Sequence, residues 1–293
     1  MASEETSQWP LTAAATQTLL ALPPSSAPKG AKPPKPKDAV KLALKELILR
    51  GAFRIQIEQR RMRKDKVTLL PGDAAGLPES LAFFDLYLRR YTPNEISMVV
   101  KGACQVNTTL IRDIGASFLE QLVEKGLAEP VKDKVLGLFP RTGWRRTATG
   151  DAWAASATEH VARLEALPGE AESNPETAAT AVGAAGALVV MVPAALAAVA
   201  RLRRKLSRHG GHVHVAYGGD DDFDVFDGVG DMFDSAFEGD LDAGVDSIDS
   251  ALDSVADSID SGVDAGVDSG GGTGDDGGGG GGDGGGGGNG GGS

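Results

Sequence analysis

The chain has 293 residues and a net charge of −12, but the charge is divided unevenly between two regions. Residues 1–210 hold all 29 Lys and Arg residues and 21 acidic residues, a net charge of +8, whereas residues 211–293 hold 20 acidic residues and no Lys or Arg. The single cysteine, Cys104, excludes an internal disulfide and is typical of a reducing compartment. A basic body favours anionic partners such as phospholipid headgroups or nucleic acid, and we expect the acidic tail to compete with them.

The N-terminal part of the chain predicts two short elements before the first hairpin. Residues 11–22 form a short helix or strand, and residues 23–37, rich in Pro and Lys, form an extended, solvated linker. A helix is expected from Asp38, its N-cap, to Gly51, which would end it in the left-handed conformation. Two runs of alternating apolar and polar residues over 53–70, separated by a basic turn, predict a hairpin.

The middle of the chain is predicted to be mostly helical. Residues 78–91 and 109–125 are expected to form amphipathic helices, because apolar residues recur every three or four positions. A shorter helix over residues 93–103 separates them. A second hairpin is expected over residues 127–144, and a further helix over residues 152–167.

Residues 177–200 carry no charged residue and are followed by a basic run, so two interpretations compete. The length and the basic flank suit a transmembrane helix. The abundance of Ala and Gly and the central Pro193 favour two packed core helices that bend at the proline. We prefer the core helices and keep a membrane-anchored protein, spanning at residues 177–200, as an alternative.

Together these elements predict a mainly α fold: a single helical domain with one or two β-hairpins, plus a disordered, acidic, Gly-rich C-terminal tail. The expected boundaries are residues 1–37 for an N-terminal segment and Pro/Lys linker, 38–208 for the helical domain and 209–293 for the tail. Within the low-complexity tail, residues 220–270 carry one narrow apolar seam. We interpret this stretch as a solvating linker, with a helix that folds on a partner as the alternative.

Four motifs, in this order along the chain, resemble the Golgi phosphoprotein 3 family, including its bacterial members. They are E-L-I-L-R-G, L-V-E-K-G-L, V-L-G-L-F-P-R-T and N-P-E-T-A-A, which begin at Glu46, Leu122, Val135 and Asn174. The resemblance covers residues 11–206 and implies a mostly helical domain with a β-hairpin, without enzyme chemistry. It also implies peripheral binding to Golgi membranes through phosphatidylinositol 4-phosphate, and a role as a sorting adaptor for the cytoplasmic tails of glycosyltransferases.

The headgroup pocket of that family combines a Trp, an Arg near the start of the first core helix, and two Arg three positions apart. Aligned on the first two motifs, these Arg positions fall on Val40, beside Lys41, and on Arg112 and Gly115, while the Trp has no counterpart. Converging cations bind phosphate headgroups. The lipid-headgroup candidates are the basic residues of these helices and of the turn in the first hairpin: Lys41, Arg60, Arg61, Arg63, Lys64 and Arg112.

The second predicted hairpin has an apolar tip flanked by cations, which is typical of a segment at a membrane interface. The membrane-hairpin candidates are Leu138, Phe139, Arg141 and Trp144. The same side chains would suit a cap on the core or a contact between two copies. Protein clients and self-association are therefore the alternative partners of this hairpin.

We expect a non-catalytic, cytoplasmic protein, peripheral to a membrane (the Golgi in a eukaryote), that binds an anionic phospholipid. Nucleic acid is the less favoured partner: each helix-plus-hairpin unit also occurs in winged-helix regulators, but no helix concentrates Arg, Lys, Asn and Gln on its exposed face. We find no nucleophile motif, nucleotide loop or convincing pair of catalytic carboxylates, so no catalytic residue and no cofactor is expected. The histidines at 209, 212 and 214 lack a fourth ligand, so no metal site is expected.

Overall fold

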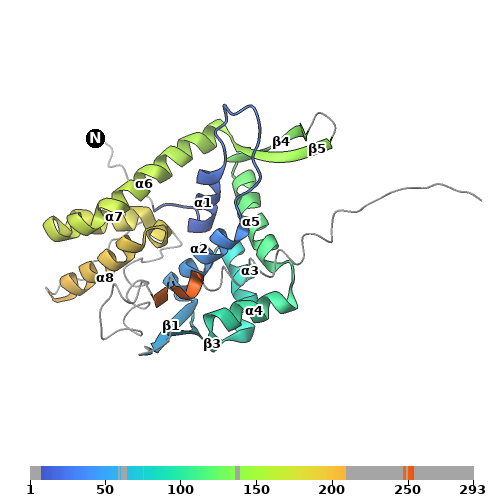
Figure 1. The fold of residues 1–293 in the computed structure, drawn as a ribbon. Helices are drawn as coiled ribbons and strands as arrows, with labels where there is room; N and C mark the ends of the chain where they lie inside the picture. The colour runs from blue at the N-terminus through green and yellow to red at the C-terminus, as the bar shows by residue number, and fades with distance from the viewer. Residues whose placement is uncertain are drawn as a thin grey trace, which may run out of the picture.

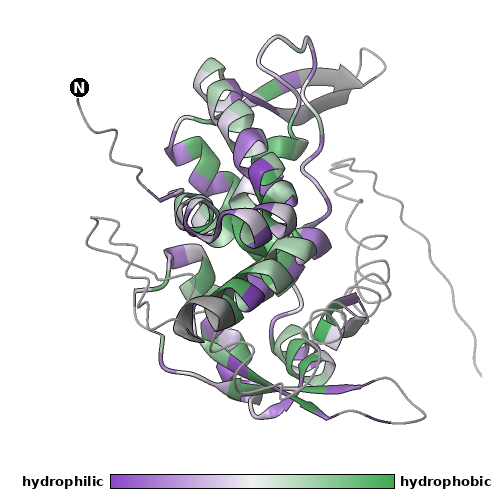
Figure 2. Ribbon diagram, turned by 90° about the vertical axis from the view of Figure 1, so that its left-hand side faces the viewer, coloured by the Kyte–Doolittle hydropathy of each residue, from purple (hydrophilic) through white to green (hydrophobic). Residues whose placement is uncertain are grey.

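A computed structural model describes residues 8–58, 60, 65–74, 76–135, 139–208, 247, 248 and 250–253. Within these residues the protein is mainly α-helical, with two small antiparallel sheets, as predicted. Figure 1 shows the two sheets at opposite ends of the helical body. Most helices carry both hydrophilic and hydrophobic residues in Figure 2, as expected of amphipathic helices that pack around a core.

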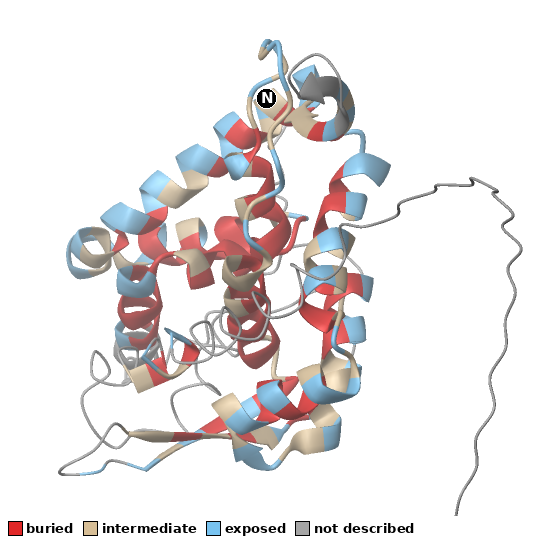
Figure 3. Ribbon diagram, turned by 45° about the vertical axis from the view of Figure 1, so that its right-hand side comes forward, coloured by how far each residue is buried: buried red, intermediate tan, exposed pale blue. Residues whose placement is uncertain are grey.

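Helices α1 (Ala13–Ala21) and α2 (Pro36–Leu49) lie at the centre of the core, where most of their residues are buried (Figure 3). The Thr12 side chain caps α1 by accepting a hydrogen bond from the backbone three residues further on. Helix α2 begins at Pro36, where the missing amide hydrogen leaves no helical bond unmade. The expected N-cap, Asp38, therefore lies in the first turn instead, where its charge suits the helix dipole.

The first hairpin forms as predicted and gains a third strand. Strands β1 (Phe53–Glu58), β2 (Lys66–Pro71) and β3 (Asn94–Glu95) pair antiparallel in that order. Gly51 ends α2 with a φ of 73°, a left-handed conformation that favours glycine, and turns the chain into β1. Apolar residues of β1, such as Ile55, are buried while their neighbours are exposed, as the alternation predicts.

Three helices follow the first hairpin. They are α3 (Glu79–Leu88), which continues into the 3-10 turn η1 (Arg89–Tyr91), α4 (Ile96–Val106) and α5 (Leu110–Glu124). Of these, α4 packs against this sheet, while α3 and α5 pack against α2. The apolar stripe predicted for α5 faces the core, and Phe118 at its centre is fully buried. The predicted helices of this region are thus confirmed to within a few residues.

The second hairpin consists of β4 (Ala128–Val135) and β5 (Phe139–Arg146). The segment before α2 differs from the solvated linker that the sequence predicts, because it pairs with β5. Ala31 and Trp144 exchange backbone hydrogen bonds of 2.9 and 2.8 Å, and the Arg146 amide donates to a carbonyl oxygen of the same segment. The linker therefore forms part of the hairpin end of the molecule.

The C-terminal helices of the body cover α1 and α2. They are α6 (Ala148–Ser173), α7 (Pro175–Ala185), the 3-10 turn η2 (Gly186–Met191) and α8 (Pro193–Arg208). Most residues of the uncharged stretch are buried in the core cluster, so the prediction of core helices that break at the proline is confirmed. In the described part of the chain, no helix has the length and hydrophobicity needed to cross a membrane.

A short piece of the acidic tail is helical and lies on the body. It comprises residues 247, 248 and 250–253, drawn in orange in Figure 1. Ile248 and Leu252 are only 4% and 1% exposed and belong to the same buried cluster as α2. In this piece the tail is therefore a helix packed on the body of the same chain, rather than the solvating linker that the sequence predicts. The rest of the predicted tail lies outside the described residues.

Candidate anion-binding surfaces

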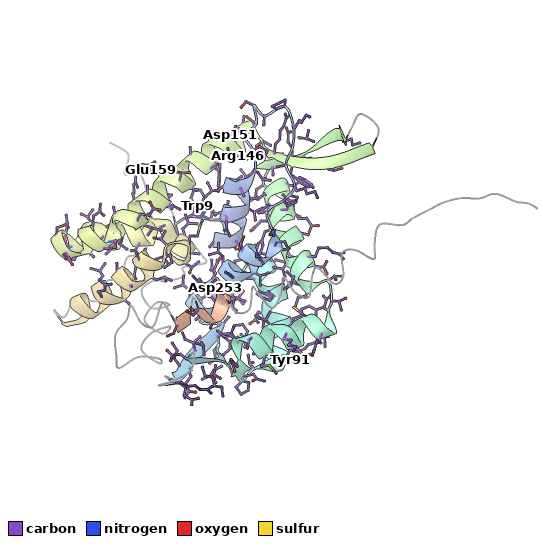
Figure 4. The ribbon with its side chains drawn as sticks, in the orientation of Figure 1. Trp9, Tyr91, Arg146, Asp151, Glu159 and Asp253 are labelled. Atoms are coloured by element: carbon purple, nitrogen blue, oxygen red, sulfur yellow. The ribbon has the colours of Figure 1, made fainter. Side chains whose placement is uncertain are left out.

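Lys41, the first headgroup candidate, already holds a carboxylate. Its Nζ donates a hydrogen bond to Asp253 Oδ1 of the acidic tail, which forms an ion pair between α2 and the tail helix. The Lys41 side chain is 25% exposed and that of Asp253 is 68% exposed, so the pair lies at the edge of the contact. Figure 4 shows Asp253 on the orange segment. The site that was expected to take a lipid phosphate is therefore occupied by an anion from the same chain.

Arg112, on α5, is exposed over 77% of its side chain, and its guanidinium lies 3.5 Å from the adjacent Asp113. Helices α2 and α5 pack closely, since a Cβ atom on Gly115 would lie 2.8 Å from the Cβ of Pro36. The two helices thus lie side by side, as a shared headgroup site requires. Among the described residues, however, no hydrogen bond or ion pair joins Arg112 to Lys41.

Arg60, in the turn of the first hairpin, is exposed and pairs with a carboxylate of its own hairpin. Its guanidinium lies 3.5 Å from Glu58, and its amide donates a hydrogen bond of 3.1 Å to Asp65. Its charge is therefore partly neutralised locally. Outside the described residues lie the other headgroup candidates of this turn: Arg61, Arg63 and Lys64.

Trp144, on the second hairpin, is half-buried and packs against the core, so it caps the core, which was the alternative interpretation of this hairpin. Its backbone holds the linker through the exchange with Ala31. The approach is close, because a Cβ atom on Gly143 would lie 2.7 Å from the carbonyl carbon of Gly30. Outside the described side chains lie the other membrane-hairpin candidates: Leu138, Phe139 and Arg141.

The linker adds lysines to the second hairpin, and the sequence reasoning missed this. Lys29, Lys32 and Lys35 are exposed on the linker, and Lys132 is exposed on β4. The linker and the hairpin that it pairs with thus carry these four exposed cations between them. A glycine in each segment, at 30 and 143, was the available signal, since isolated glycines in strands often mark a close backbone approach.

Two arginines of β5 fasten the linker to the hairpin and to α6. Arg145 donates a hydrogen bond of 3.1 Å to the Ala27 carbonyl oxygen, and it pairs with Glu129 at 2.7 Å. Arg146 pairs with Asp151 at 3.0 Å, as Figure 4 shows at the top of the molecule. The two hydrogen bonds from Ser25 to the Asp151 carboxylate, from its hydroxyl and its amide, lower the pKa of that carboxyl group, with a smaller effect of the arginine.

The E-L-I-L-R-G motif contains a buried carboxylate with a structural role. Glu46 is fully buried, accepts a hydrogen bond of 2.8 Å from the Ala13 amide at the start of α1, and accepts another of 2.9 Å from Arg50. Burial raises the pKa of Glu46 above its ordinary value of 4.5, and Arg50 offsets part of this increase. Glu46 therefore joins α1 to α2 and is closed to external ligands.

The two hairpins lie at opposite ends of the molecule in Figures 1 and 3. Arg60 of the first hairpin and Trp144 of the second, the described candidates of these two segments, therefore do not belong to one patch. No group of His, Cys, Asp and Glu in the described part of the chain is arranged to hold a metal, and the three clustered histidines lie outside it.

Comparisons with models of protein families, with curated proteins and with solved structures find no match.

Proposed function

We propose that the chain is a non-catalytic, peripheral membrane protein whose second-hairpin end binds anionic phospholipid. One observation supports this above the others: the linker pairs with β5 and so places its exposed lysines beside the hairpin. The sequence between the two strands, L-G-L, is apolar and continues into Phe139. Exposed cations beside an apolar turn suit the boundary between lipid headgroups and acyl chains.

The expected strength of binding follows from the number of cations. Each Lys or Arg near an anionic leaflet contributes about 1 kcal/mol, so Lys29, Lys32, Lys35 and Lys132 together contribute about 4 kcal/mol. Salt screens such contacts, with a Debye length of about 8 Å at physiological ionic strength. Binding should therefore be reversible and sensitive to salt.

The finer parts of the proposal come from the resemblance to the Golgi phosphoprotein 3 family. Phosphatidylinositol 4-phosphate is the candidate lipid, and Lys41 and Arg112, on neighbouring helices, are the residues that would select its phosphate. A role as a sorting adaptor on Golgi membranes rests on the resemblance alone.

Vesicle co-sedimentation of the full chain tests the proposal. The vesicles contain phosphatidylcholine alone, phosphatidylcholine with phosphatidylserine, or phosphatidylcholine with phosphatidylinositol 4-phosphate. We expect salt-sensitive binding to both anionic vesicles and a roughly 30-fold weakening in the double variant Lys32→Gln, Lys35→Gln, since two cations are lost. Lys101→Gln, an exposed lysine on α4, is the matched control and should bind like the unmodified chain.

Equal binding to neutral and anionic vesicles would overturn the proposal. Tight binding to duplex DNA with a steep salt dependence, without vesicle binding, would instead favour the winged-helix alternative.

A further inference from the structure

The tail helix is held on the body by apolar and polar contacts together. Ile248 and Leu252 are buried one helical turn apart, and Asp253 pairs with Lys41 on α2. At the other end of the segment, the hydroxyl of Ser247 donates a hydrogen bond of 2.8 Å to Asp65, just before β2. The body therefore has a docking surface, which includes Lys41 on α2 and Asp65 just before β2, that accepts a helix with two apolar residues followed by an aspartate.

The tail carries this pattern three times. Residues 237–269 divide into three consecutive 11-residue repeats: F-E-G-D-L-D-A-G-V-D-S, I-D-S-A-L-D-S-V-A-D-S and I-D-S-G-V-D-A-G-V-D-S. In each repeat the first and fifth residues are apolar and the sixth is aspartate. In the second repeat these positions are Ile248, Leu252 and Asp253, which are the residues seated on the docking surface.

We propose that the second and third repeats exchange on the docking surface, so that the third repeat, residues 259–269, docks when the second leaves. Ile259, Val263 and Asp264 would then occupy the positions of the seated residues. Eleven residues make three helical turns, so a helix presents the same face in each repeat. The body is basic and the tail is acidic, so electrostatic attraction favours a docked repeat over an empty docking surface.

The second repeat is the preferred occupant because it forms a helix more readily. It has Ala251 and Val255 where the third repeat has Gly262 and Gly266. A glycine inside a helix lowers its population about threefold to fivefold, so the two glycines favour the second repeat roughly tenfold. Two ligands on one tether keep the surface occupied for a larger part of the time than one ligand alone.

A zero-length carbodiimide, which couples an amine to a carboxylate in direct contact, tests the proposal on the full chain. Peptide mapping of the unmodified chain should find Lys41 coupled to Asp253. In Asp253→Asn the coupling should move to Asp264. Asp257→Asn, which removes a carboxylate of the same repeat outside the motif, is the control and should leave the coupling to Asp253 unchanged.

Each outcome of this experiment decides the proposal. Loss of all Lys41 coupling in Asp253→Asn would overturn the exchange of repeats, and no coupling to Asp253 in the unmodified chain would overturn the docking itself. Coupled dimers would place the repeat on a second copy and overturn an intramolecular exchange.

Asp253 is largely exposed, so its substitution leaves the fold intact. A second variant, Leu252→Ser, should raise the coupling to Asp264 roughly tenfold over the unmodified chain.

Exchange of the repeats should also affect lipid binding, an expectation that rests on the proposed function and is measured separately. A docked repeat neutralises Lys41, so the double variant Asp253→Asn, Asp264→Asn should bind vesicles with phosphatidylinositol 4-phosphate several-fold more tightly than the unmodified chain. Unchanged vesicle binding beside the expected coupling pattern would refute this link to lipid while the exchange stands. Absence of any vesicle binding would refute the proposed function alone.

Discussion

Glu46 is a residue whose charge state is set by its surroundings. It is buried between α1 and α2, and its pKa is raised above 4.5. At pH values between 4.5 and the raised pKa, the Glu46 carboxyl group is protonated in the folded chain and largely ionised in the unfolded chain. The contribution of the Glu46 proton to stability is therefore complete below pH 4.5 and falls as the pH rises through the raised pKa.

Glu46→Gln, which cannot titrate, should thus gain stability relative to the unmodified chain as the pH is raised from about 4 to about 8. The gain is about 1.4 kcal/mol for each unit by which the Glu46 pKa is raised. Urea unfolding of both proteins across this pH range measures it. If the difference in the free energy of unfolding between the two proteins stays constant with pH, or if the variant loses stability relative to the unmodified chain, the raised pKa of Glu46 is refuted.

Two glycines of α6 should respond in opposite directions to alanine. A Cβ atom on Gly150 would lie 2.0 Å from the Leu127 carbonyl oxygen, whereas one on Gly169 would meet no atom within 4 Å. Gly150→Ala should therefore destabilise the protein by about 1–3 kcal/mol, because backbone must shift. Gly169→Ala should stabilise it by about 0.5–1 kcal/mol. Thermal unfolding compares the two, and equal effects would refute the close contact.

At the scale of elements, local patterns predicted the helices and the hairpins. Helical periodicity identified α2, α3 and α5, and alternation identified β1, because these patterns reflect which side of an element is buried. Two contacts were not predicted because they join distant segments. Residues 23–37 pair with β5, more than 100 residues later, through a backbone approach that leaves no periodic signal. The helix of the tail forms against α2, and its composition alone predicted an unfolded stretch.

For the candidate site, the sequence identified Lys41 as a cation that binds an anion and the acidic tail as a competitor, but not Asp253 as the residue that pairs with it. Distance in the sequence explains this, since Asp253 lies 212 residues further on. The lysines of the linker were missed for the same reason. Charge patterns show how many cations a segment carries, and only the fold shows which segments bring them together.

Gly143→Val should detach the linker from β5 without unfolding the body, because the new side chain would meet the Gly30 backbone at 2.7 Å. We expect exchange of the Ala31 and Trp144 amide hydrogens to speed up roughly 30-fold or more, while core amides of α2 keep their protection. Thr142→Val, an exposed neighbour on the same strand, is the control. Unchanged exchange in Gly143→Val would show that the linker is held by other contacts.

At the scale of the whole molecule, the separation of charge sets the response to an anionic surface. Deleting residues 211–293 changes the net charge from −12 to +8 and frees Lys41. The shortened chain should bind anionic vesicles at least tenfold more tightly than the full chain at low salt. Deleting only residues 270–293, which carry three acidic residues and lie beyond the repeats, is the control and should have little effect. Equal affinities of the full and shortened chains would refute competition by the tail.

The burial of Ile248 and Leu252 has a practical consequence for anyone who trims this protein at the last helix of the body. Removing all residues after Arg208 exposes to solvent the apolar surface against which those two side chains pack. Trimmed molecules should then stick to one another as their concentration rises, a tendency that light scattering would register and that a short acidic peptide with the sequence of the second repeat should suppress.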